Sequence, residues 1–197
     1  MSPGYHKHPE ENYLSSNDEY RTVIGMLLYA SCNSRPDISA TVNILSQRIS
    51  QPRLCDLQEA IRTAKYLKQT KHLALRLHNP SDIQEIIAWS DADHGENRVD
   101  RRSNSGVMIF ANGGLMHWTS KKQSLVHVST CDAEMFAIHE AMKPTLWLIE
   151  DMKFFGVTND SPTVLKNDNQ AAISNIVGNN FAHKSKHLRL CGQATNQ

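Results

Sequence analysis

Three acidic residues fall where a layered protein of sheet and helices places functional groups. Asp91 ends one expected strand, Asp168 ends a later strand, and Glu134 lies in the first turns of a long expected helix. Carboxylates that converge repel one another unless cations lie between them. Oxygen-rich clusters of this kind suit magnesium or manganese. If the three acids meet, they predict a site for divalent metal ions.

Each acid also has a simpler structural explanation. Asp91 and Asp93 could close a turn, Glu134 could stabilise the positive end of its helix, and Asp168 could cap the next helix. Asp91 and Asp93 are two residues apart and share one face of a strand, so their spacing cannot decide which points into a site. The residues alone leave both the site and its membership open.

Positive charge is concentrated in one stretch of an otherwise balanced chain. The 197 residues carry 21 Lys and Arg against 20 Asp and Glu, a formal net charge of +1. Arg62, Lys65 and Lys68 recur every third residue, so neighbours in this series lie side by side on an expected helix. They are candidates for a grip on a phosphate backbone, and a solvated helix face is the simpler interpretation.

The composition predicts a folded protein of the cell interior. Hydrophobic residues make up 40% and charged residues 21%, which is too apolar for a disordered chain. The four cysteines form no C-x-x-C pair, which favours a reducing compartment over a zinc site or disulfides. The first sixteen residues lack the apolar core of a signal peptide, and no apolar run could span a membrane. We therefore expect an intracellular protein, cytoplasmic or nuclear, that is not secreted.

Periodicity predicts the elements that would position these residues. Helices are expected from about Asp18 to Cys32, from Pro36, from Asp56, over about 130–155 and over about 169–176. Strands are expected at 73–77, 85–91, 105–111, 115–119 and 163–166. Asn112, Gly113 and Gly114 should form a tight hairpin turn between two of these strands. This order predicts an α/β (α+β) layered fold.

Two details of the expected helices can be checked directly. The helix from Asp56 should bury an apolar stripe and turn its basic residues to the other side. The stripe consists of Leu57, Ile61, Ala64 and Leu67. Pro144 should kink or break the long helix that carries Glu134, because proline removes a backbone donor.

Several spaced motifs resemble a known family. Three runs resemble the end of a copia-type retrotransposon reverse transcriptase: 20–29 (YRTVIGMLLY), 35–39 (RPDIS) and 64–68 (AKYLK). Five further runs resemble the RNase H domain that follows it in the same Pol polyprotein: 90–93 (SDAD), 100–106 (DRRSNSG), 118–123 (WTSKKQ), 133–134 (AE) and 168–170 (DNQ). The motifs occur in the family's order over roughly residues 18 to 190.

The resemblance implies a domain order and an RNase H-like fold. Residues 1–16 would be a flexible lead-in, 17–72 a helical segment from the end of the reverse transcriptase, and 73–197 a C-terminally truncated RNase H-like domain. That domain would hold a mixed sheet with helices, preceded by the small helical segment.

The resemblance also implies an activity. Asp91, Glu134 and Asp168 match three of the four RNase H carboxylates, which would bind two Mg²⁺ or Mn²⁺ ions and cut the RNA strand of an RNA–DNA hybrid. The reverse transcriptase portion of Pol is a further candidate partner, and no membrane is implied. The hybrid would be held by its shape and backbone. Candidate phosphate contacts, about equally explained as solvated surface, are Arg101, Arg102, Lys121 and Lys122.

The chain departs from the family pattern at several positions. His94 stands in place of the usual Trp, and Cys131 and Asp132 replace Thr and Glu before Glu134. Arg189 stands where the best candidate for the fourth acid is expected. A non-catalytic remnant that binds nucleic acid and a fragment without function are therefore the alternatives to a nuclease.

Overall fold

The computed structural model describes Tyr5, residues 13–77, 85–93, 100–156 and 163–178, and the backbone of 188–192. The chain divides into two compact units, Met1–Leu75 and Arg76–Gln197. Each unit has its own cluster of buried hydrophobic side chains.

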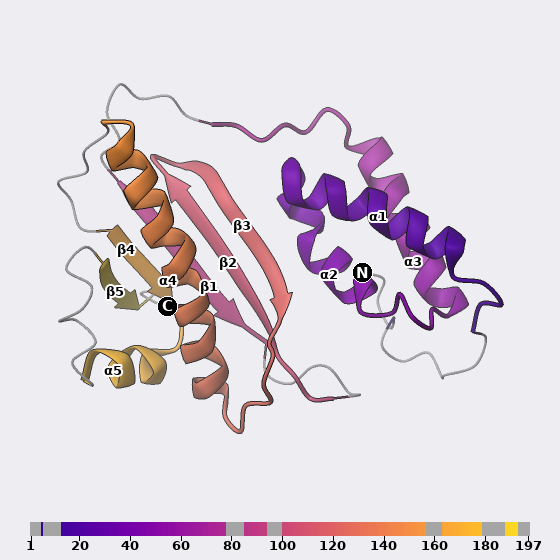
Figure 1. Cartoon of the computed structure of the whole chain (residues 1–197). Coiled ribbons are helices and arrows are strands. Elements are labelled where there is room, and N and C mark those ends of the chain that lie inside the picture. Colours follow the sequence, from indigo (N-terminus) through magenta and orange to yellow (C-terminus); the bar gives the residue numbers. More distant parts are fainter. Residues whose placement is uncertain are drawn as a thin grey trace, which may run out of the picture. The chain divides into compact units, whose positions relative to one another are not determined.

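The first unit is helical (Figure 1). Its elements are α1 (Asp18–Asn33), the 3₁₀ turn η2 (Pro36–Ile38), α2 (Ser39–Ser46) and α3 (Leu54–Gln69). In α1, Tyr20, Ile24 and Leu27 are buried at spacings of four and three residues, which places them on one helix face. The Tyr20 hydroxyl donates to the carbonyl oxygen of Leu45 at 2.7 Å, so the buried phenol is satisfied. The helix expected from Pro36 is present as η2 followed directly by α2.

The predicted buried stripe of α3 is wrong. Ile61 and Ala64 are exposed, and Leu57 and Leu67 are only half-buried. The buried positions of the helix are instead Asp56, Glu59, Ala60 and Thr63. A pattern that counts only apolar residues misses this face, because polar residues can be buried when they are paired.

The start of α3 shows how that pairing works. The helix begins at Leu54, earlier than predicted, with Arg53 as its N-cap residue and Asp56 in its first turn. Asp56 accepts hydrogen bonds from the Arg53 backbone N–H at 2.8 Å and from the Arg53 guanidinium at 2.9 Å. The hydroxyl of the buried Tyr5 also donates to Asp56. Tyr5 is thereby fastened to the start of α3, as is Tyr13 through an antiparallel bridge to Arg53.

The strand predicted over 73–77 does not form. Leu73 is 49% exposed and Leu77 is 60% exposed, and only Leu75 between them is half-buried, so this alternation does not face a core. Alternation can suggest a strand, but a strand also needs a neighbour with which to exchange backbone hydrogen bonds.

The second unit is built on a five-stranded mixed sheet in the order β3-β2-β1-β4-β5 (Figure 1). The strands are β1 (Ile86–Ala92), β2 (Asn104–Ala111), β3 (Gly114–Lys122), β4 (Thr163–Asn167) and β5 (Leu188–Gly192). β1, β2 and β3 pair antiparallel, whereas β4 runs parallel to β1 and β5 runs parallel to β4. The sequence patterns do not predict β5.

Local sequence explains the β2–β3 hairpin. Asn112 and Gly113 have φ angles of 48° and 79°, the left-handed conformation that a two-residue hairpin turn needs at both central positions. Asparagine and glycine adopt it at low cost. The predicted turn is therefore confirmed, with Gly114 already the first residue of β3.

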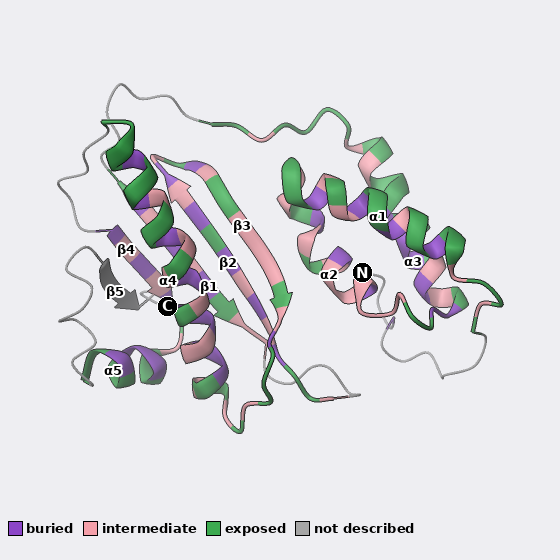
Figure 2. Cartoon of the chain, viewed as in Figure 1, coloured by how far each residue is buried: buried purple, intermediate pink, exposed green. Residues whose placement is uncertain are grey.

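Helix α4 (Thr130–Phe154) lies along one face of the sheet, and α5 (Gln170–Gly178) follows β4 (Figure 1). Figure 2 shows buried positions alternating along β1, β2 and β4 and lining the sheet side of α4. The core cluster includes Ile86, Ala88, Val107, Ile109, Ile138, Ala141 and Leu165. Burial of every second residue in β1, β2 and β4 confirms a layered arrangement of sheet and helix.

Pro144 does not break α4, which continues to Phe154. The next residue, Thr145, is fully buried and donates its hydroxyl to the carbonyl oxygen of Ala141 at 2.6 Å. Packing on the sheet therefore holds the helix across a proline that would weaken it in isolation. Of the helices in the described ranges, none combines the length and apolar character that crossing a bilayer requires.

Candidate metal centre

Adjacent parallel strands bring two of the predicted acids to the same edge of the sheet. Trp89 of β1 pairs with Lys166 of β4. Asp91 and Asp168 each lie two residues further along, so they leave neighbouring strands at matching positions. The Lys166 ammonium lies 4.7 Å from the centre of the Trp89 ring, which ties the two strands just before the acids.

Helix α4 supplies the third acid. Ser129 caps the helix by accepting a hydrogen bond from the backbone N–H of Asp132 at 3.1 Å. Glu134 follows in the next turn and is only 6% exposed. Asp91, Glu134 and Asp168 each offer a carboxylate oxygen, and these oxygens lie within 4.8 Å of one another. The three acids singled out in the sequence therefore converge, and such a donor set could hold a divalent metal ion.

Burial and mutual repulsion raise the pKa values of two of these acids, Glu134 and Asp91. Burial raises the pKa of Glu134, and the carboxylates of Asp91 and Asp168 raise it further, while a hydrogen bond from Asn167 opposes them. Asp91 is an exposed residue overall, yet desolvation of its carboxylate raises its pKa, as do the charges of Asp168 and Asp93. Like charges held this close favour a cation between them.

Asp93 is held outside this cluster. Its carboxylate accepts hydrogen bonds from the backbone nitrogen of Asn104 at 2.6 Å and from the Asn104 side-chain amide at 2.7 Å. Its own N–H donates to the Asn104 carbonyl oxygen at 3.1 Å. The strand spacing left Asp91 and Asp93 as equal candidates, and the structure assigns Asp93 to fastening the end of β1 to β2.

Two uncharged residues support the acids and were missed by the sequence analysis. Asn167 is 1% exposed, and its amide donates to Oε2 of Glu134 at 2.8 Å. Gln123 is 2% exposed and donates to the Ser105 hydroxyl at 2.9 Å and to the Ala133 carbonyl oxygen at 3.0 Å, one residue before Glu134. Both lie in or beside family-like motifs, but a search for charged groups passes over amides.

The four basic candidates near the sheet fall into two pairs. Lys122 and Arg102 lie 2.6 Å and 3.8 Å from a carboxylate oxygen of Asp100, so their charges are partly neutralised. Arg101 and Lys121 are exposed, and Arg101 has a φ of 55°. Arg102 and Lys122 are thus paired with a carboxylate, whereas Arg101 and Lys121 face solvent.

The basic residues of α3 all face solvent. Arg62, Lys65 and Lys68 are exposed, and the side chain of Arg62 lies 3.4 Å from a carboxylate oxygen of Glu59. Among the described contacts, neither Lys65 nor Lys68 is paired with a carboxylate. The helix therefore presents a positively charged face.

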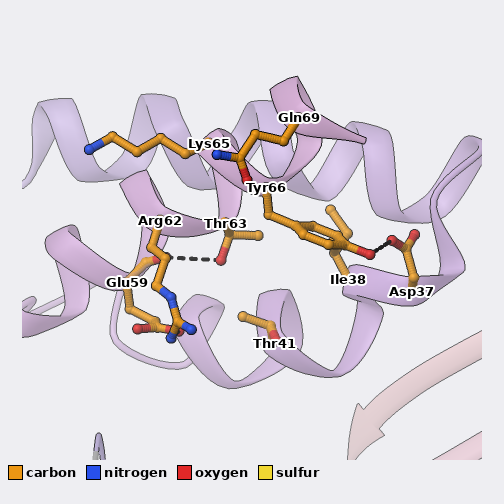
Figure 3. Close-up of a pocket in the computed structure, with 9 residues that line it drawn as sticks. All are labelled: Asp37, Ile38, Thr41, Glu59, Arg62, Thr63, Lys65, Tyr66 and Gln69. Carbon is orange, nitrogen blue, oxygen red and sulfur yellow. Dashed lines mark hydrogen bonds and ion pairs between the residues drawn. The ribbon is translucent and has the colours of Figure 1, made fainter. Parts of the chain in front are cut away.

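A separate hollow lies within the helical unit, between α3 and the η2–α2 segment (Figure 3). It has a volume of about 480 Å³. At one end the Tyr66 hydroxyl donates to Asp37 at 2.8 Å, and at the other Arg62 lies beside Glu59. Its carboxylates are already paired, so the charge pattern favours no particular ligand.

No family model matches the chain. Over 132 residues it is 34% identical to Secreted RxLR effector protein 161 of Plasmopara viticola, covering 67% of this chain and 92% of that protein. Over 177 residues it is 29% identical to the Retrovirus-related Pol polyprotein from transposon RE1 of Arabidopsis thaliana, covering 90% of this chain. Over 169 residues it is 28% identical to the corresponding polyprotein from transposon TNT 1-94 of Nicotiana tabacum, covering 86% of this chain. The chain spans 12% of the length of each polyprotein.

Among solved structures, the chain resembles a foamy viral protease-reverse transcriptase in complex with dsDNA, with a TM-score of 0.54 and 9% identity. The match covers 98% of this chain and 40% of that protein. Together with the strand order, this confirms the predicted RNase H-like mixed sheet preceded by a small helical segment.

The predicted location is wrong. A relative that shares 34% identity over two thirds of the chain is named a secreted effector, which contradicts an intracellular protein that is not secreted. Cysteine spacing and apolar runs constrain redox chemistry and membrane insertion, and neither determines whether a protein is exported.

Relatives from several retrotransposons cover most of the chain, in agreement with the motifs and with the fold. Over most of its length, the chain is thus similar to copia-type retrotransposon Pol polyproteins.

Proposed function

We propose that the second unit is a metal-dependent nuclease of the RNase H type that cuts the RNA strand of RNA–DNA hybrids. The convergence of Asp91, Glu134 and Asp168 carries this proposal, because their oxygens lie within 4.8 Å on an RNase H-like sheet. Similarity to Pol polyproteins supports it, since the acids lie in the motifs that resemble the Pol RNase H domain.

The three carboxylates would hold Mg²⁺ or Mn²⁺. Two such ions, when bound, would supply activation of the attacking water and stabilisation of the leaving 3′ oxygen. Glu134 is buried and fixed by a hydrogen bond, whereas Asp91 and Asp168 are exposed and accessible to a phosphodiester. A phosphate approaching three ionised carboxylates would be repelled, so the acids need the cation before they can act on nucleic acid.

Exposed basic residues would hold the nucleic acid backbone. Arg101 and Lys121 face solvent on the same unit as the acids, and they are stronger candidates than Arg102 and Lys122, whose charges Asp100 partly neutralises. Contacts of this kind read the backbone and the 2′-hydroxyls, which distinguish a hybrid from double-stranded DNA.

A second candidate function is nucleic-acid binding without cleavage. The solvent-facing row of Arg62, Lys65 and Lys68 on α3 favours it, because such a row suits a phosphate backbone at any sequence. This function requires no metal and would survive substitution of the acids.

The test is cleavage of an RNA–DNA hybrid labelled on its RNA strand, with Mg²⁺ and then Mn²⁺, beside single-stranded RNA and double-stranded DNA. We expect cleavage of the hybrid that chelation of the metal abolishes. Asp91→Asn should remove the activity, whereas Asp18→Asn, an exposed acid in the first turn of α1, should retain it. Folded protein that binds the hybrid without cutting it would favour the second function instead.

A further inference from the structure

Asn167 sits at the junction of β4, β1 and the start of α4. It is the last residue of β4 and is 1% exposed. Its side-chain nitrogen donates to the Ser90 carbonyl oxygen at 3.0 Å, to the Ser90 hydroxyl at 3.2 Å and to Oε2 of Glu134 at 2.8 Å. One amide therefore joins the strand that carries Asp91 to the helix that carries Glu134.

The other end of the Asn167 side chain is fixed as well. Its Oδ1 accepts a hydrogen bond from the backbone N–H of Asn169 at 2.9 Å, across the residue Asp168. Exchanging the amide oxygen and nitrogen by rotation would break the bonds to the Ser90 carbonyl, to Glu134 and from the Asn169 N–H, so the orientation is fixed. Its orientation is set on one side by Ser90 and on the other by the turn that carries Asp168.

The consequence falls on Glu134. Because Oε2 accepts the N–H of Asn167, rotation of the carboxylate is restricted, and Glu134 is held with an oxygen within 4.8 Å of those of Asp91 and Asp168. A partner that orients a ligating group commonly decides how well a metal is held. Asparagine suits this position, since aspartate would set one acceptor against another and an apolar side chain would offer no donor.

We propose that Asn167 is a positioning residue for the divalent cation: by holding Oε2 of Glu134, it keeps this carboxylate beside Asp91 and Asp168. This inference rests on the proposed metal function of the three acids. It concerns the affinity of the site for the cation and assigns no step of the reaction to Asn167.

The test is titration of the full chain with Mn²⁺, followed by calorimetry, for the wild type and for Asn167→Leu and Asn167→Ala. Leucine keeps much of the buried volume, and both variants remove the donor. We expect Mn²⁺ affinity to fall by about 10- to 100-fold in each, the range typical when an outer-shell partner is removed. Asn175→Ala is the matched control, because Asn175 donates to the Cys131 sulfur at 3.4 Å and no described contact joins it to the three acids.

The outcomes separate this inference from the proposed function. Wild-type affinity in folded Asn167→Leu, alongside loss of binding in Asp91→Asn, would overturn the role of Asn167 and leave the metal site standing. A wild-type chain that binds no Mn²⁺ would overturn both.

A measurement on the wild type covers the case in which the variants fail to fold. In an NMR titration with Mg²⁺, the side-chain NH₂ signals of Asn167 should shift along the same saturation curve as the backbone signal of Glu134. Signals of Asn167 that stay unchanged at saturating Mg²⁺ would contradict the coupling between the two residues.

Discussion

Asp93 and Asn104 exchange three hydrogen bonds across the open end of the β1–β2 pair, with the Asp93 carboxylate accepting at 2.6 Å and 2.7 Å. These hydrogen bonds engage the carboxylate of Asp93, which strand spacing alone could not distinguish from Asp91 as a site residue. The candidate metal site therefore consists of Asp91, Glu134 and Asp168, with Asp93 fastening the strands beside it.

Removing the Asp93 carboxylate should affect stability and spare the metal. Asp93→Ala leaves a backbone N–H and a side-chain amide of Asn104 without their acceptor, which should cost about 1–3 kcal/mol of unfolding free energy. Urea denaturation followed by tryptophan fluorescence measures this cost, because all three tryptophans lie in the second unit. Mn²⁺ affinity should stay within about threefold of the wild type. A loss of binding as large as that of Asp91→Ala would place Asp93 in the site.

Mn²⁺ binding should strengthen as the pH rises above the usual carboxylate range. The pKa values of Asp91 and Glu134 are raised above their ordinary values of 3.8 and 4.5. At acid pH both carboxyl groups therefore carry protons, which a metal ion must displace in order to bind. Calorimetric titrations at several pH values should show affinity that is weakest at acid pH and levels off once both groups have ionised. Affinity that does not change from pH 4.5 to pH 7.5 would contradict the raised pKa values.

Without metal, Asp91→Asn should stabilise the second unit at neutral pH. A carboxyl whose pKa is raised in the folded state contributes stability that is present at low pH and lost as the pH rises through the raised pKa. Asp91→Asn removes one of the crowded negative charges and so restores part of the lost stability. Each kcal/mol gained in unfolding free energy should raise Tm by about 2–4 °C. Thermal unfolding in a chelator measures the effect.

The same pair of proteins tests linkage to the metal. Saturating Mg²⁺ should raise Tm in the wild type and leave Asp91→Asn unchanged, since only a site that binds the ion gains stability from it. Equal Tm increases in both proteins would mean that the ion binds elsewhere.

The basic face of α3 should contribute to nucleic-acid binding. Replacing Lys65 and Lys68 with glutamine should weaken binding at low salt. It should also reduce the slope of log K against log[salt] by about 0.9 for each duplex phosphate that the variant no longer neutralises. Lys143→Gln with Lys153→Gln on α4 changes the net charge equally and is the matched control. If both double variants weaken binding by the same factor, net charge alone accounts for the effect.

The Arg53–Asp56 pair should be the most sensitive point of the helical unit. Asp56→Asn leaves a buried guanidinium without its counter-ion and weakens the hydrogen bond from Tyr5, which should cost about 3–5 kcal/mol. Far-ultraviolet circular dichroism during urea denaturation reports on the helices, while tryptophan fluorescence follows the other unit. Asp18→Asn at the exposed start of α1 should cost less than about 1 kcal/mol.

Local patterns predicted most of the sheet and its helices. The hairpin at Asn112 and Gly113 and the alternating burial of β1 and β2 follow from residue types a few positions apart. The strand β5 was missed because its identity depends on parallel pairing with β4, more than twenty residues away in the chain. The buried face of α3 was misjudged because Asp56 and Glu59 are polar, and their burial depends on partners that periodicity does not show.

Sequence patterns predicted the three acids of the candidate site but not the residues that hydrogen-bond to them. Asp91, Glu134 and Asp168 stand at strand ends and at a helix start, where sequence position already implies a place in the fold. The exclusion of Asp93 required the hydrogen bonds with Asn104, and the role of Asn167 required a hydrogen bond between residues 33 positions apart. Such pairings are set by tertiary structure and leave no spacing signal in the sequence.

The most direct test of the account compares hybrid cleavage by four variants in Mg²⁺ at saturating substrate. Asp91→Asn, Glu134→Gln and Asp168→Asn should each lower the rate by roughly a hundredfold or more, because each removes a ligand of ions that contribute several kcal/mol to the transition state. Asp93→Asn should retain a rate close to that of the wild type. Cleavage that persists in all three acid variants, or folded wild-type protein that cuts no hybrid, would contradict the assignment of this cluster as a nuclease site.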